Sequence, residues 1–396
     1  MSYIKKIIRN IVIFFYKIIF HLLKTKKNII LFESSNGRNY TGNPKYIYEY
    51  LINSPMCDKF KYVWSVEDTS LDIPGHPIKV RRTRLKYLYY SIVSNFWIFD
   101  SRHPKYLLKK NDCIYIQTWH GTPLKKLALD MNQLNMSGKT DINQYKAEFK
   151  ENTSFWNYLI AQNDFSADIF SRAFDFKGTM LKIGYPRNDI LIKEKNNAEL
   201  KSIIKEKLKI AKNKKIILYA PTWRDNEFHS EGLYKFTSKM DFDLMKEKLA
   251  NDYTLIIKYH YLVRENIDWN KYSDFIVITD EKQEIQDLYL ISDILITDYS
   301  SVMFDYSLLN KPMIFYTYDL DYYKKNLRGF YFNIEEEVPG PIIEKNEDLI
   351  TYLENFSFDD YFLEFEDKYS KFREKYNQYD KGDSSKKVAK LIMSNN

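Results

Sequence analysis

Short apolar runs without polar alternation recur along the chain, and they restrict its possible folds more than any other feature. Residues 28–33, 113–117 and 294–297 are examples, all rich in Ile. Strands that are buried on both faces have such sequences, which are typical of parallel sheets covered by helices. Segments of helical period separate the runs, as at 242–249 and 285–291. This alternation of strand and helix predicts an α/β fold.

The apolar runs form two series, and at 396 residues the chain is long enough for two domains. A Lys- and Glu-rich segment at 193–215 separates the series. We therefore expect an N-terminal domain at 28–195 and a C-terminal domain at 196–396 that ends in helices. The loop after the first predicted strand, at 34–44, lacks the GxGxxG pattern of dinucleotide-binding proteins.

Residues 1–27 are both apolar and basic. Their apolar side chains recur at three- and four-residue spacing, as on one face of a helix: Ile4, Ile7, Ile8, Ile11, Phe15, Ile18 and Leu22. The longest apolar run, 11–16, is far shorter than the roughly 20 residues that cross a bilayer, and no small-residue cleavage site suggests a signal peptide. We expect an amphipathic helix on an anionic membrane surface. The alternative is a helix packed on the protein's own body.

The overall composition narrows the possible partners. The net charge of +7, from 60 Lys and Arg against 53 Asp and Glu, favours anionic ligands. No recognition motif, zinc spacing or basic block predicts nucleic-acid binding, and no P-loop is present. The two cysteines, Cys57 and Cys113, are far apart, which fits a reducing compartment. No carboxylate or cysteine pattern requires a metal, and we expect no cofactor.

The strongest candidate for chemistry is the turn after the strand at 113–117. It comprises Trp119, His120, Gly121, Thr122 and Pro123. We expect Thr122 to cap a helix that begins at Pro123. His120 would then lie at the carboxyl end of a strand and beside a helix N-terminus, where ligands and anions bind in α/β sheets. A histidine of the core is the alternative interpretation.

Other polar clusters also follow predicted strands, so two facing domains would gather them around one cleft. His120 and His260 are suited to proton transfer near neutral pH, and Arg187 and Lys258 to holding phosphate oxygens. Ser300 and Ser301 precede a predicted helix at 302 and would form an anion seat. The remaining candidates for substrate binding are Asn188, Pro221, Thr222, Tyr259 and Asp305. His103, which follows another strand, is predicted to serve in packing or on the acceptor side.

As a set, these motifs resemble the CDP-glycerol glycerophosphotransferase family of teichoic acid and capsule polymer synthesis. The resemblance spans about residues 28–345 and rests on Thr-Trp-His-Gly-Thr-Pro-Leu-Lys (118–125), Gly-Tyr-Pro-Arg-Asn-Asp (184–189), Tyr-Ala-Pro-Thr-Trp-Arg (219–224), Leu-Ile-Thr-Asp-Tyr-Ser-Ser-Val-Met-Phe-Asp (295–305), Arg-Gly-Phe-Tyr (328–331) and Pro-Gly-Pro (339–341). It implies a GT-B-like fold: two Rossmann-like domains with the site between them, the N-terminal one for the acceptor and the C-terminal one for CDP-glycerol. It also implies CDP-glycerol as donor and a place on the cytoplasmic face of the cell membrane.

In the expected reaction, a hydroxyl group of a lipid-linked polyprenyl acceptor attacks the β-phosphate of CDP-glycerol, and CMP is released. His120 is expected to be the general base, and His260 to bind the pyrophosphate or protonate the CMP side. Asp305 either caps a helix or holds a donor hydroxyl. The chain lacks the long amino-terminal extension of the large polymerases, so it looks more like the short members that prime or extend a linkage unit. A short polymerase is the alternative.

Three other functions stay open at this point. Family members commonly have Arg-Met-His where this chain has Lys258-Tyr259-His260, which leaves CDP-ribitol as an alternative donor. A glycosyltransferase that uses a nucleotide sugar is a second alternative. A non-catalytic protein that binds anionic polymer at the membrane surface is the third. The sequence does not determine the oligomeric state.

Overall fold

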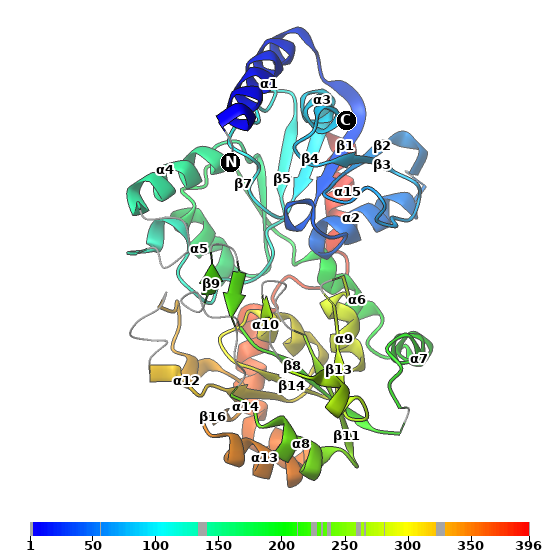
Figure 1. Cartoon of the computed structure of the whole chain (residues 1–396), viewed down its shortest axis with the longest axis vertical. Coiled ribbons are helices and arrows are strands. Elements are labelled where there is room, and N and C mark those ends of the chain that lie inside the picture. Colours follow the sequence, from blue (N-terminus) through cyan, green and yellow to red (C-terminus); the bar gives the residue numbers. More distant parts are fainter. Residues whose placement is uncertain are drawn as a thin grey trace.

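The computed structural model describes residues 3–55, 57–133, 141–211, 213–222, 228–230, 233–235, 239–258, 263–264, 267–280, 282–321 and 329–395. Figure 1 shows two α/β domains, one above the other, each built around its own sheet. Both sheets are entirely parallel. The predicted α/β architecture with two Rossmann-like domains is therefore confirmed.

The first sheet has seven strands in the order β3-β2-β1-β4-β5-β6-β7. Their bounds are β1 Lys26–Glu33, β2 Lys61–Val66, β3 Ile78–Arg81, β4 Ser94–Phe99, β5 Ile114–Gln117, β6 Tyr158–Ala161 and β7 Thr179–Lys182. The helices of this half are α2 Gly42–Ile52, α3 Leu85–Val93, α4 Ile142–Thr153 and α5 Asp164–Ala173. All six side chains of β4 are buried, as expected for a central strand covered on both faces.

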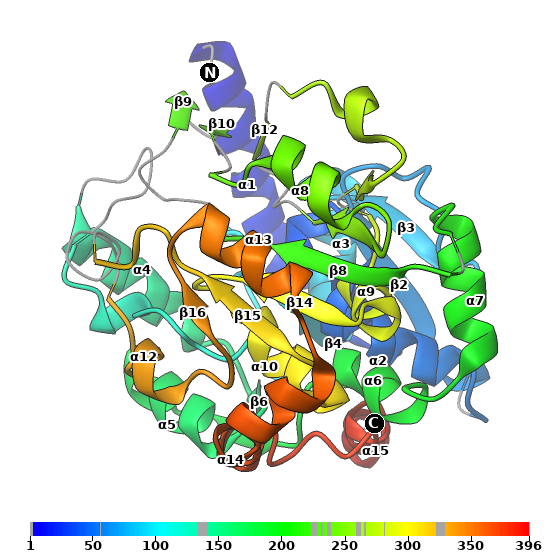
Figure 2. The same cartoon turned by 90° about the horizontal axis from the view of Figure 1, so that it is seen from below.

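The second sheet has six strands in the order β13-β11-β8-β14-β15-β16. They are β8 Lys215–Ala220, β11 Tyr253–Ile257, β13 Ile276–Ile278, β14 Ile294–Thr297, β15 Met313–Tyr316 and β16 Ile342–Ile343. Its helices are α8 Phe242–Leu249, α9 Ile285–Ile291, α10 Val302–Tyr306, α12 Ile334–Glu337, α13 Asn346–Glu354 and α14 Phe358–Tyr376. Figure 2 shows α8 and α13 over one face of the sheet, where they share a core with its strands. A small sheet of β9 Phe228–Ser230, β10 Leu233–Lys235 and β12 Val263–Arg264 stands apart.

The chain crosses between the domains at two places. The first crossing carries α6 Asp189–Lys193 and α7 Ala198–Lys207. The second follows α14, after which α15 Ser384–Ser394 packs against α2 of the first domain (Figure 1). Val388, Ala389 and Ile392 of α15 belong to the same buried cluster as Ile47 and Tyr48 of α2. The sequence analysis assigned this last helix to the C-terminal domain, but its core contacts are with the N-terminal one.

Helix α1, Tyr3–Leu22, lies against the first domain through one face only (Figure 1). On that face Tyr16 is buried, and its hydroxyl accepts a hydrogen bond of 3.0 Å from the Leu108 N–H. The opposite face is apolar and exposed: the exposed fractions are 55% for Ile8, 62% for Phe14 and 75% for Leu22. The helix packs on the protein's own body through one face and presents an apolar surface on the other, and its contact with a membrane stays a prediction. Of the helices in the described ranges, none has both the length and the apolar content that a membrane crossing requires.

Helix α4 lies next to the site. It occupies 142–153 and is capped by the Asp141 side chain, which accepts from two backbone N–H groups. Tyr145 and Phe149 of α4 are buried in the core of the first domain, and this packing fixes the helix beside the turn that holds His120.

Candidate active site

The turn after β5 takes an extended path instead of starting a helix, so the predicted helix at Pro123 is wrong. Leu124 is drawn into the core of the second domain. The backbone on both sides of it pairs with the segment at 329–331: the Tyr331 N–H donates to the Leu124 carbonyl at 3.0 Å, and the Lys126 N–H to the Gly329 carbonyl at 3.2 Å. Thr122 does not cap a helix; its hydroxyl donates to Gln162 at 2.6 Å. These contacts between domains override the local preference for a helix.

His120 is held in one orientation. Its Nδ1–H donates to the carbonyl oxygen of Asp100 at 2.9 Å, and its ring stacks on Trp119 with 4.4 Å between the centroids. Because a carbonyl can only accept, this contact places the hydrogen on Nδ1 and leaves Nε2 with its lone pair. The ring is exposed to a cavity, but the protein atoms around it partly desolvate it, and this desolvation lowers its pKa. The Asp100 carbonyl opposes that shift and the charge of Arg187 adds to it. His120 is therefore neutral at pH 7 and able to accept a proton.

The structure brings most of the predicted residues together around one cavity of about 300 Å³. The first domain contributes Trp119, His120, Gly121, Thr122 and Pro123, and the second contributes Pro221, Thr222, Ser300 and Ser301. The two walls are close: a Cβ added to Gly121 would lie 2.9 Å from the Ser301 hydroxyl oxygen. A larger residue at 121 would therefore force the Ser301 side chain to move.

Ser300, one of the two residues of the predicted anion site, is hydrogen-bonded within its own turn. The Val302 N–H donates to the Ser300 hydroxyl at 3.4 Å. Asp298 shapes the opposite wall, since its carboxylate accepts from the Thr222 N–H at 2.8 Å. Both turns follow neighbouring parallel strands, β8 and β14, which explains why they meet at one edge of the sheet.

Lys258 lies on a second cavity, of about 330 Å³, which also reaches His120 and Arg187. Its ammonium group donates to the carbonyl of Gln283 at 2.8 Å and to that of Asp280. The positive charge is therefore fixed beside the cleft. Tyr259 and His260, which were predicted to act with Lys258, lie outside the described residues.

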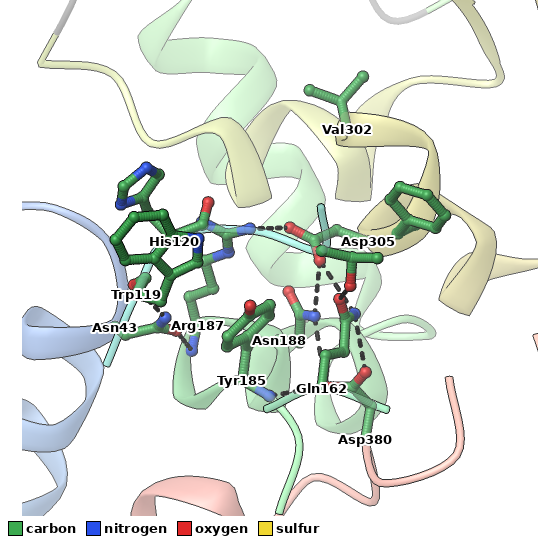
Figure 3. A network of polar contacts seen from close by, with 12 residues as sticks. Asn43, Trp119, His120, Gln162, Tyr185, Arg187, Asn188, Val302, Asp305 and Asp380 are labelled. Carbon is green, nitrogen blue, oxygen red and sulfur yellow. Dashed lines mark hydrogen bonds and ion pairs between the residues drawn. The ribbon is translucent and has the colours of Figure 1, made fainter. Parts of the chain in front are cut away.

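Asn188 and Asp305 lie behind the cavity in a buried polar network, which Arg187 joins from the wall of the second cavity (Figure 3). The Asp305 carboxylate forms an ion pair of 2.6 Å with Arg187 and accepts hydrogen bonds from Asn188 at 2.9 Å and from Gln162 at 3.1 Å. Arg187 also donates to the carbonyl oxygen of His120 at 2.9 Å. The network thus joins the second domain, through Asp305, to the turn that carries the candidate base.

Sequence reasoning missed four residues of this site: Asn43, Asp100, Gln162 and Asp380. Asn43 donates to the carbonyls of Thr118 and Trp119, and Gln162 donates to Asp380 at 2.9 Å. Asp100 directly follows β4, so the rule that polar residues gather after strands could have found it. Asp380 follows α14 and has no comparable signal. Burial, and secondly the charge of Asp305, raise the pKa of Asp380 to about 7.

Comparison with known proteins assigns the chain to a family. Residues 14–394 match the model of the CDP-glycerol:poly(glycerophosphate) glycerophosphotransferase family. The teichoic acid poly(glycerol phosphate) polymerase of Bacillus spizizenii is 42% identical over 97% of this chain and 98% of its own length. The teichoic acid glycerol-phosphate transferase of Staphylococcus aureus is 38% identical over 98% of both chains.

Longer relatives and solved structures agree with this assignment. The polymerase of Bacillus subtilis is 41% identical over 93% of this chain, which spans 49% of that protein. A solved structure of the wall teichoic acid polymerase TagF superposes with a TM-score of 0.91 at 39% identity and covers 99% of this chain and 95% of that one. The architecture is accordingly GT-B-like. The chain belongs to the CDP-glycerol:poly(glycerophosphate) glycerophosphotransferase family.

Proposed function

We propose that the protein transfers glycerol phosphate from CDP-glycerol to a hydroxyl group of a lipid-linked acceptor in teichoic acid or capsule polymer synthesis. The observation that carries this proposal is His120, a neutral imidazole with Nε2 available, on a cavity between two domains of this family. A transferase of this kind needs a base for the acceptor hydroxyl beside a site for the donor phosphates.

In the proposed reaction, the acceptor oxygen forms a bond to the β-phosphorus of CDP-glycerol while Nε2 of His120 takes the hydroxyl proton. The bond between that phosphorus and the bridging oxygen breaks, and CMP leaves with the electron pair. Ser300, Ser301 and Thr222 line the donor side, and the fixed charge of Lys258 offsets phosphate charge. We assign His260 to the leaving group.

The contacts of Arg187 favour a positioning role for this residue. Its guanidinium is already paired with Asp305 and donates to the His120 carbonyl. It therefore acts on the reaction through the backbone of the candidate base. The sequence analysis expected Arg187 to hold donor phosphate directly. We now assign it the positioning role instead.

The apolar face of α1 supports a peripheral place on an anionic membrane. Ile8, Phe14 and Leu22 are exposed on it, and Lys5, Arg9 and Lys17 lie on the same helix. Apolar burial and attraction to anionic lipid would act together there. A lipid-linked acceptor would be concentrated at the same surface.

The direct test incubates the purified protein with labelled CDP-glycerol and a lipid-linked acceptor, and then measures the CMP released and the size of the product. We expect one CMP for each glycerol phosphate joined. Products many units long would identify a polymerase, as in the Bacillus spizizenii relative, whereas addition of one or a few units would identify a transferase or primase. Transfer from CDP-ribitol or a nucleotide sugar, with none from CDP-glycerol, would contradict the proposal.

A further inference from the structure

A separate cavity of about 430 Å³ has His120 in its wall. Its walls come from the first domain alone: Asn36, the segment 101–105 after β4, the turn at 119–120, residues 127–128 and helix α4. Trp119, His120 and Leu127 line both this cavity and the one shared with the second domain. His120 therefore borders both cavities.

The cavity contains a fixed positive charge. The guanidinium carbon of Arg102 lies 4.5 Å from the centre of the Phe149 ring and 5.3 Å from that of Tyr145, so two aromatic rings of α4 hold it. Among the residues that the structure describes, Arg102 has no carboxylate partner. Lys105 adds a second charge at the rim, where it pairs with Glu148. An arginine that is held in place without a counter-ion is suited to bind a phosphate group.

Neutral polar groups lie deeper in the same cavity. His103 is 4% exposed and Asn152 is 6% exposed, and both side chains line the cavity. Within the described part of the chain, Nδ1 of His103 and Oδ1 of Asn152 are buried without a hydrogen-bond partner. Groups left in this way are costly, and native proteins have few of them. Burial, with the charges of Arg102 and Lys109, lowers the pKa of His103 to about 3, so the ring is neutral and suited to pair with hydroxyl groups.

We propose that this cavity is the acceptor site, and that it binds the alditol phosphate end of the acceptor. In it, Arg102 contacts the phosphodiester, His103 and Asn152 pair with alditol hydroxyls, and the terminal hydroxyl points to Nε2 of His120. The proposal rests on the proposed function. It fits the geometry of the transfer, since the entering oxygen and the departing CMP must lie on opposite sides of the phosphorus. His120 lines both this cavity and the one shared with the second domain, so a hydroxyl in the first can approach a phosphate in the second.

The test measures acceptor and donor kinetics separately, with Arg102→Leu and the control Lys150→Gln. Lys150 lies on α4, the helix whose rings hold Arg102, but its ammonium pairs with Asp175 and it does not line the cavity, so the control removes one positive charge near the site without changing the cavity. The probe is a soluble acceptor that ends in glycerol phosphate. We expect Arg102→Leu to raise the KM for this acceptor about ten-fold or more, the effect of losing a charge-assisted hydrogen bond. The KM for CDP-glycerol should stay within about two-fold, and Arg102→Lys should recover part of the loss.

Two further measurements make the outcome unambiguous. A neutral sugar acceptor without phosphate should be used about equally by the wild type and Arg102→Leu, which identifies the phosphate as the group recognised. Thermal unfolding confirms that the variants are folded. An unchanged acceptor KM in folded Arg102→Leu, or equal rises in donor and acceptor KM, would overturn the acceptor assignment while leaving the proposed function standing. Failure of the wild type to transfer glycerol phosphate from CDP-glycerol would instead overturn the proposed function itself.

Discussion

The ion pair between Arg187 and Asp305 gives the sharpest prediction about stability, because it joins the two domains behind the candidate base. Asp305 is 2% exposed, and its carboxylate accepts from Arg187, Asn188 and Gln162. Asp305→Asn keeps the shape of the side chain, but it removes the charge and replaces one acceptor oxygen by an NH₂ donor. In either orientation of the amide, that NH₂ group faces a donor.

The expected loss of folding stability in Asp305→Asn follows from these contacts. Removing one partner of a buried ion pair costs about 3–5 kcal/mol, because the other charge stays buried without compensation. For a protein of this size that lowers the unfolding temperature by roughly 5 °C. The control is Asp367→Asn on α14, whose carboxylate is paired with Lys371 but is almost fully exposed. It should change stability by about 0.5 kcal/mol or less.

Calorimetry measures the unfolding temperatures of the three proteins, and hydrogen exchange of the segments at 119–125 and 302–306 shows whether the loss is local to the contact between the domains. We expect faster exchange in these segments in Asp305→Asn. If this variant unfolds at the wild-type temperature, the pair is solvated in solution, and Arg187 is then available for donor phosphate as the sequence first suggested.

Four further predictions concern other parts of the molecule. Because the raised pKa of Asp380 means that the folded state holds a proton that the unfolded state has lost, this group should lower stability as pH rises from about 4 to 7. Asp380→Asn should therefore gain about 2–3 kcal/mol relative to wild type between pH 5 and 8, as measured by urea unfolding, and parallel profiles would refute this reasoning. His120→Ala should bind CDP-glycerol in calorimetric titration but turn over about 10² times more slowly or worse, and near wild-type turnover in the folded variant would remove His120 from the mechanism. Turnover should survive EDTA, since the described residues hold no group of three His, Cys, Asp or Glu placed to bind a metal; loss that Mg²⁺ or Mn²⁺ restores would be the contrary result. Replacing Phe14 and Leu22 by Ser should weaken co-sedimentation with anionic vesicles, with Leu363→Ser as the control for an exposed apolar side chain elsewhere, and equal binding by all three proteins would place the membrane contact outside α1.

Local sequence predicted the elements well wherever burial on both faces dominates. The strand expected at 294–297 is β14 with the same bounds, and the one expected at 113–117 is β5 at 114–117. Such strands need apolar side chains in every position, so a short stretch of sequence is sufficient to recognise them. The polar residues after these strands met at one cleft for the same reason, since parallel strands end at a common edge.

The features that sequence reasoning missed depend on contacts between distant parts of the chain. Thr122 and Pro123 have the local preferences of a helix start, but Leu124 gains more by entering the core of the other domain. Asp380 joins the site only because the chain returns to the first domain after α14. Neither contact leaves a periodic pattern in the sequence, so neither could be predicted from it.

The return of α15 to the first domain has a consequence for synthesis on the ribosome. The cluster around Ile47 and Tyr48 needs Val388 and Ile392, which are translated only after the whole second domain. The second sheet can therefore close during translation, while the first domain waits with an uncovered apolar strip that chaperones can bind. A chain that stops before residue 384 would keep both sheets and all the motifs, yet it would lack the part of the first domain's core that α15 supplies. The fold thus couples completion of the first domain to translation of the second.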